Sequence, residues 1–120
     1  MREFGIDVGK TDQPELHFAH DIQQDSIDLF KVRLSFERLI NEYSRLNGID
    51  PRRYPMHRVL RALQKNEKIS PNVINGVLEV MAICNYAVHG ETVSDNQIAF
   101  VFDSAPGLFE ALKKGLQSNA

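Results

Sequence analysis

The segment from Ser70 to Gly90 places the strongest limit on what this chain can fold into, because it is apolar on nearly every side of a helix. Ser70 suits an N-cap, Pro71 suits the first turn, and Gly90 suits the left-handed residue after the last turn. A helix of about 18 residues, roughly 27 Å long, is therefore predicted here. Because a helix that is apolar all round must be covered by neighbours, we expect it at the centre of the fold. Gly76 in its interior predicts a close crossing by another backbone.

Apolar residues spaced three and four apart predict further helices around this central one. The first is expected to start at Asp25 or Ser26, either of which can cap it, and to end at the turn of Gly48. A shorter helix is expected from about Pro55 to Lys65. The inward-facing residues are expected to be Leu29, Val32, Phe36, Leu39, Tyr43 and Leu46 in the first of these helices, and Met56, Val59, Leu60 and Leu63 in the second.

The last predicted helix starts at a capping box, in which Ser94 and Gln97 cap each other's backbone. Pro106 interrupts the segment, because an interior proline loses one backbone hydrogen bond and clashes with the preceding turn. The alternatives are one helix kinked between Phe102 and Pro106, or two short helices of which Ser104 caps the second. The inward-facing residues are expected to be Ile98, Phe102, Ala105, Phe109, Leu112 and Leu116.

These elements predict an all-α, up-and-down bundle of four to five helices over residues 25–117. A chain of 120 residues, 42% of them hydrophobic, is long enough for one such core. Residues 1–24 are expected to form an extended arm or a short β-hairpin, since Phe4, Ile6 and Val8 alternate with polar or small residues.

The sequence lacks the signals of a membrane-spanning or secreted chain. No apolar run approaches the ~18 residues that a membrane-spanning helix needs, and no hydrophobic leader follows Met1. The single cysteine, Cys84, cannot form an intramolecular disulfide, which is typical of a reducing compartment. We therefore expect a cytoplasmic domain, or the cytosolic part of a longer membrane-anchored protein, that makes no membrane contact itself.

The formal net charge of −2 conceals an uneven distribution. Residues 1–30 hold seven acidic and two basic residues, residues 31–68 hold four acidic and ten basic, and residues 69–120 hold five acidic and two basic. Cations in the middle segment that could contact RNA, a nucleotide or another phosphate are Arg45, Arg52, Arg53, Arg58, Arg61, Lys65 and Lys68. We call these seven residues the basic cluster.

The basic cluster has two interpretations. Arg58, Arg61, Lys65 and Lys68 share one helix side if the helix extends that far, and Tyr54 beside them could stack on a base. However, the pI of about 6.1 lies well below the ~9 expected of an electrostatic nucleic-acid binder. A solvated helix face that pairs with acidic regions is therefore favoured over RNA or nucleotide binding.

The end of the central helix carries the one group of residues with evident chemistry. Asn85 and His89 lie four apart and project from the same side of the helix, just before Gly90. An imidazole can donate or accept a proton, and an amide beside it could orient a phosphate or a hydroxyl. The alternative is structural: a polar pair near a helix end caps carbonyl groups and fixes the next loop.

The string from Cys84 to Gly90, together with Phe36–Ile40 and the short basic helix, resembles the HEPN (higher eukaryote and prokaryote nucleotide-binding) superfamily over about residues 25–117. It is most similar to bacterial HEPN-like domains with an Asn-x-Ala-Val-His-Gly signature. The resemblance implies a bundle that commonly dimerises. In the catalytic branch, an Arg and a His from each protomer meet in one cleft and cleave RNA. By this resemblance His89 is the motif His and Asn85 the motif Asn.

Two positions depart from the catalytic pattern. The position of the motif Arg is Cys84, which offers neither the charge nor the forked geometry that suits a phosphate. The regulatory Tyr of toxin-type members, two residues beyond the His, is Glu91 here. Cys84 also lies on an apolar side of the predicted central helix, so its expected role is packing.

We therefore expect a non-catalytic, HEPN-like module that forms a homodimer or binds a protein partner, in which Cys84, Asn85, His89 and Gly90 form a structural motif. The alternative is a metal-independent RNase, or a nucleotide- or RNA-binding domain, that uses His89 and Asn85 with the basic cluster. No cofactor is expected. A metal site is not expected either, because His17 and His20 have no completing ligands.

Overall fold

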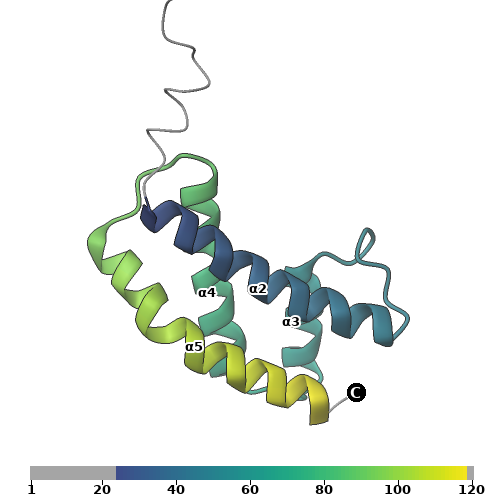
Figure 1. The fold of residues 1–120 in the computed structure, drawn as a ribbon. Coiled ribbons are helices and arrows are strands. Elements are labelled where there is room, and N and C mark those ends of the chain that lie inside the picture. Colours follow the sequence, from purple (N-terminus) through teal and green to yellow (C-terminus); the bar gives the residue numbers. More distant parts are fainter. Residues whose placement is uncertain (1–23, 119–120) are drawn as a thin grey trace, which may run out of the picture.

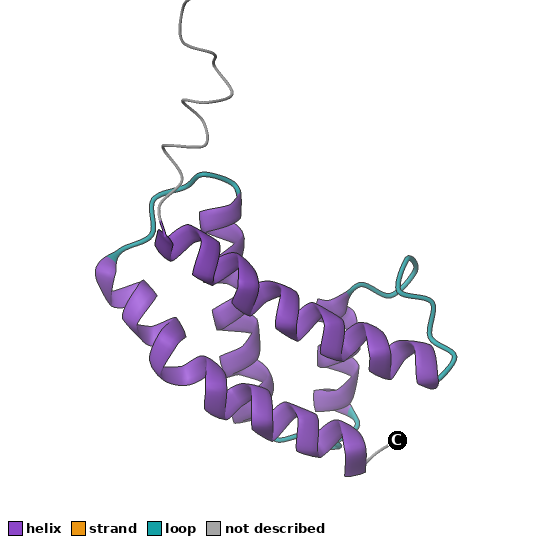
Figure 2. Cartoon of the chain, in the orientation of Figure 1, coloured by secondary structure: helices purple, strands orange, loops and turns teal. Residues whose placement is uncertain are grey.

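The computed structural model describes residues 24–118, and its helices are arranged as a bundle (Figure 1). In chain order the helices are α2 (Gln24–Leu46), α3 (Met56–Lys65), α4 (Pro71–Val88) and α5 (Asp95–Ser118). Only helices and loops occur in this range (Figure 2). The predicted all-α bundle is confirmed with four helices. The predicted N-terminal arm or hairpin lies outside the described residues, except for Gln24, which belongs to α2.

Helix α4 is the centre of the bundle, as its all-round apolar surface predicts. It contacts α2, α3 and α5, and the side chains of Ile74, Val77 and Val80 are fully buried. Ser70 caps its start by accepting a hydrogen bond from the backbone N–H of Asn72 (3.2 Å). The close crossing predicted at Gly76 comes from a side chain rather than from another backbone. A Cβ atom there would lie 2.8 Å from Cδ2 of Leu108 on α5.

Helix α2 meets its neighbours along a line that differs in part from the predicted stripe. Its buried residues are Leu29, Phe36, Ile40 and Ser44. Leu46, predicted to face inward, is 66% exposed because it lies in the last turn, off this line. The contact line is shifted because α2 packs against α4 and α5 together. The predicted caps also differ, since Asp25 and Ser26 lie inside a helix that already includes Gln24.

Helix α5 is one continuous helix with Pro106 inside it, which decides between the two alternatives. Its ribbon bends near the middle (Figure 1). Proline there removes the bond to the carbonyl of Phe102, and the exposed ring lies on the solvent side. The capping box is confirmed: Ser94 N–H donates to Oε1 of Gln97 (2.9 Å), and Gln97 N–H donates to Oγ of Ser94 (3.1 Å). Val101 is buried, whereas Phe102, predicted to face inward, is 39% exposed.

Three of these four helices end in the same backbone turn. At the ends of α2, α3 and α4, the residues Gly48, Glu67 and Gly90 take positive φ angles of 70°, 57° and 78°. In each turn the N–H of the next residue donates a hydrogen bond back to the helix, as Ile49 N–H does to the Ser44 carbonyl (2.8 Å).

Among residues 24–118, no helix is both long and apolar enough to cross a membrane.

Candidate functional site

The predicted motif lies at the C-terminal end of α4, where backbone atoms close the turn. Gly90 N–H donates to the carbonyl of Ala87 (3.1 Å), and Glu91 N–H donates to that of Tyr86 (2.8 Å). The His89 side chain is exposed and that of Asn85 is half-buried. Within residues 24–118 neither side chain takes part in a hydrogen bond. The turn is therefore held by the backbone and by the conformation of Gly90, rather than by the polar pair.

This geometry predicts different effects for two neighbouring substitutions. We expect Gly90→Ala to lower the free energy of unfolding by about 1–2 kcal/mol, because a Cβ is strained at φ 78°. We expect His89→Ala to change it by less than about 0.5 kcal/mol, because the imidazole is exposed. Urea unfolding followed by circular dichroism measures both. A His89→Ala variant that lost as much stability as Gly90→Ala would show that the imidazole itself holds the turn.

Cys84, at the position of the motif Arg, has the surroundings of a packing residue. Its side chain is 0% exposed, and this burial raises the pKa of the thiol to about 11. The charge and backbone of Arg33 on α2 offset part of that rise. The thiol is therefore neutral at physiological pH, whereas a nucleophilic cysteine reacts as the thiolate.

Arg33 is a cation near the motif that was not singled out from the sequence. It comes from α2, is partly buried, and its Nε donates to Oε2 of Glu37 (3.0 Å). A sequence signal was available, because Arg33 interrupts the line of Leu29 and Phe36 that faces the core. A charged residue on such a line requires a partner or a site.

A pocket of about 400 Å³ lies beside the motif, between the start of α2 and the loop after α4. Its ionisable lining residues are Asp25 and Glu91. No arginine or lysine from the described residues lines it. The acidic lining disfavours a phosphate or an RNA strand at this place.

The basic cluster lies at the other end of α4, so the structure does not bring it to His89. Arg61 on α3 donates to Oδ1 of Asn75 (3.1 Å), near the start of α4. Asn75 and His89 are about 21 Å apart along the axis, at 1.5 Å per residue. Neither Arg58 nor Arg61 makes a hydrogen bond to His89. A site within one chain that combines His89 with this cluster therefore has no geometric support.

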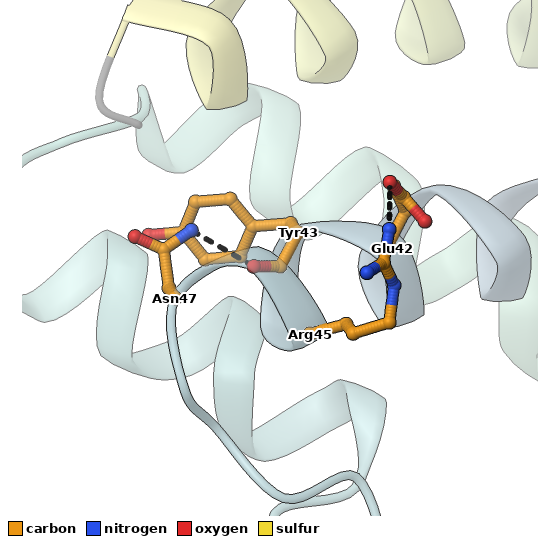
Figure 3. Close-up of polar contacts among 4 residues, drawn as sticks. All are labelled: Glu42, Tyr43, Arg45 and Asn47. Carbon is orange, nitrogen blue, oxygen red and sulfur yellow. Dashed lines mark hydrogen bonds and ion pairs between the residues drawn. The ribbon is translucent and has the colours of Figure 1, made fainter.

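The members of the basic cluster also differ from one another. Arg45 forms an ion pair with Glu42, in which its Nη2 lies 2.6 Å from Oε2 (Figure 3). Arg52 forms a second pair, in which its Nε lies 3.6 Å from Oδ1 of Asp50. The predicted row of four cations is interrupted, because α3 ends at Lys65 and Glu67 turns the chain before Lys68.

Within residues 24–118, no group of three or more His, Cys, Asp or Glu residues could hold a metal ion. His17 and His20 lie outside the described residues. Comparisons of the chain with family models, with curated proteins and with solved structures gave no match. The resemblance to HEPN domains therefore stays a prediction from the sequence.

Proposed function

We propose that this chain is a non-catalytic, HEPN-like helical domain that self-associates and acts as an interaction or regulatory module. The observation that carries the proposal is the burial of Cys84, a neutral residue at the position where the resemblance implies an Arg. The acidic lining of the pocket beside the motif also argues against RNA at this end of the bundle.

Support for self-association comes from exposed apolar side chains at the same end. Ser26 and Ala87 line one pocket, and Arg33 lies near Cys84, so α2 and α4 run antiparallel. Ile27 and Phe30 of α2 are therefore level with Tyr86 and Val88 of α4. All four are 39–46% exposed. Ile27 and Phe30, three residues apart, also share one side of α2, and large apolar residues exposed on one helix side are typical of an interface between proteins.

An RNA-cleavage assay tests the non-catalytic part of the proposal. The purified chain is incubated with structured RNA, beside His89→Ala as the matched control. We expect no cleavage above background in either sample. Cleavage by the wild-type chain that His89→Ala abolishes, with an unchanged melting temperature, would refute the proposal.

A metal-independent RNase is the second candidate, because the charge of Arg33 on α2 acts on Cys84, which stands at the position of the motif Arg. In that case the cleavage would be lost equally in Arg33→Met and His89→Ala, and it would persist in EDTA. Lys31→Met, an exposed cation on the same helix, is the control that should retain it.

A further inference from the structure

We infer that an apolar groove between α2 and α5 binds a segment of the same chain that precedes α2, through the side chains of Leu16 and Phe18. Both residues lie outside the described residues, and we call the groove the α2–α5 groove. At about 100° of rotation per residue, Ile27 and Phe30 lie on the other side of α2 from Phe36, which lines the groove. The inference is therefore independent of the proposed self-association.

The α2–α5 groove is formed by two pockets that follow each other along the same two helices. The first has a volume of about 350 Å³ and lies between residues 32–36 of α2 and 102–110 of α5. The second has a volume of about 280 Å³ and lies between residues 39–47 of α2 and 113–117 of α5. Along each helix the lining residues recur every three or four positions, so they lie on one side of it. The two pockets therefore form one groove, roughly 20 Å long.

The groove presents apolar side chains that the four described helices leave uncovered. Phe102 is 39% exposed and Leu46 is 66% exposed, although the sequence predicts that both face inward. Val32, Leu39 and Phe109 are only partly buried. A groove of exposed apolar side chains between two helices is typical of a docking site for a protein segment. A bound segment would account for the apolar positions that α4 does not cover.

The chain before α2 is long enough to reach both pockets. Phe36 lies 12 residues after Gln24, about 18 Å along the axis of α2. Phe18 lies six residues before Gln24 and reaches about 20 Å in an extended chain. Leu16 reaches about 26 Å, beyond the level of Leu39 at about 22 Å. A segment that turns back along α2 can therefore place Phe18 at the first pocket and Leu16 at the second.

The pattern and the attachment of this segment favour it over other occupants. Leu16 and Phe18 alternate with Glu15, His17 and Ala19, so an extended chain presents the two apolar side chains on one side. A segment joined to α2 by a short linker has an effective concentration of about millimolar order at the groove. A second copy of the chain in micromolar solution is far more dilute, so the chain's own segment is the expected occupant.

The test places a nitroxide spin label on this segment in the full chain. Ala19→Cys carries the label, and Cys84→Val removes the only native thiol. We expect the label to broaden the amide NMR signals of residues 32–39 and 102–113, which line the groove. Phe18→Ser is expected to lower the ratio of bound to free segment by at least about tenfold, because a ring leaves an apolar site, and the broadening should be lost.

His17→Ser is the matched control, because an extended chain points this side chain away from Leu16 and Phe18. It should change the ratio by less than about twofold. A mixture of labelled chain with unlabelled, isotope-enriched chain should show no broadening in the groove. Broadening there would overturn the inference, because it would make a second copy the occupant. Unbroadened groove signals in the labelled chain, or broadening that persists in Phe18→Ser, would also overturn it.

Discussion

Replacing Cys84 by Arg is expected to unfold the domain rather than to create a catalytic pair. Cys84 is fully buried at the centre of the bundle, and Arg33 lies close to it. An uncompensated charge at such a site costs about 3–5 kcal/mol, and the longer side chain adds about 1–3 kcal/mol of overpacking. Repulsion from Arg33 adds to this cost. The total is comparable to the whole stability of a small domain, about 5–15 kcal/mol.

Thermal unfolding of Cys84→Arg followed by circular dichroism measures this effect, and we expect a loss of the cooperative transition. Cys84→Val is the matched control, because it keeps the site apolar and similar in size and should melt within a few degrees of the wild type. A Cys84→Arg protein that melts cooperatively near the wild-type temperature, and that cleaves RNA in a His89-dependent way, would contradict the structural role of this position.

Phe36→Ala is expected to lower the free energy of unfolding by about 3–5 kcal/mol, because it removes a whole ring from the core. Phe36 is 1% exposed, and its ring meets that of Phe109 edge to face, with centroids 5.4 Å apart. The contact joins α2 to α5, so its loss weakens the two helices that pack side by side on α4.

Phe102→Ala is the matched control for this substitution. Phe102 lines the same apolar groove between α2 and α5, but it is 39% exposed and has less surface to lose. We expect Phe102→Ala to lower the free energy of unfolding by about 1 kcal/mol. Urea unfolding of the two variants checks the difference. Equal losses would show that Phe102 contributes as much to the core as Phe36 does, which would contradict the difference in their exposure.

The parts of the fold that local chemistry determines could be predicted from the sequence. Ser70, Gly90 and the pair of Ser94 and Gln97 mark helix ends through hydrogen bonds or φ angles that only a few residue types supply. The central place of α4 followed from its apolar residues on all sides.

The parts that depend on packing between helices could not be predicted in the same way. Leu46 and Ile40 are equally apolar, and only the positions of α4 and α5 decide that Ile40 is buried and Leu46 exposed. The place of Arg33 beside Cys84 depends on the antiparallel register of α2 and α4. The distance between His89 and Arg61 likewise depends on which end of α4 packs against α3.

The arrangement gives the two ends of the bundle different chemistry. One end carries the exposed apolar side chains around His89 and the acidic pocket lined by Asp25 and Glu91. The other end carries the basic cluster and a pocket lined by Tyr54 and Arg58. A module that self-associates through the first end would leave the second end exposed to solvent.

Light scattering of the full chain at micromolar concentration measures whether the chain self-associates. We predict a mass twice the 13.7 kDa of the chain. Phe30→Asp should reduce it to the single-chain mass. Leu46→Asp changes an apolar position that is more exposed, 66% against 46% for Phe30, at the far end of the same helix, and it should leave the mass unchanged. A wild-type chain of 13.7 kDa under these conditions, or a Phe30→Asp variant that stays dimeric, would contradict the account.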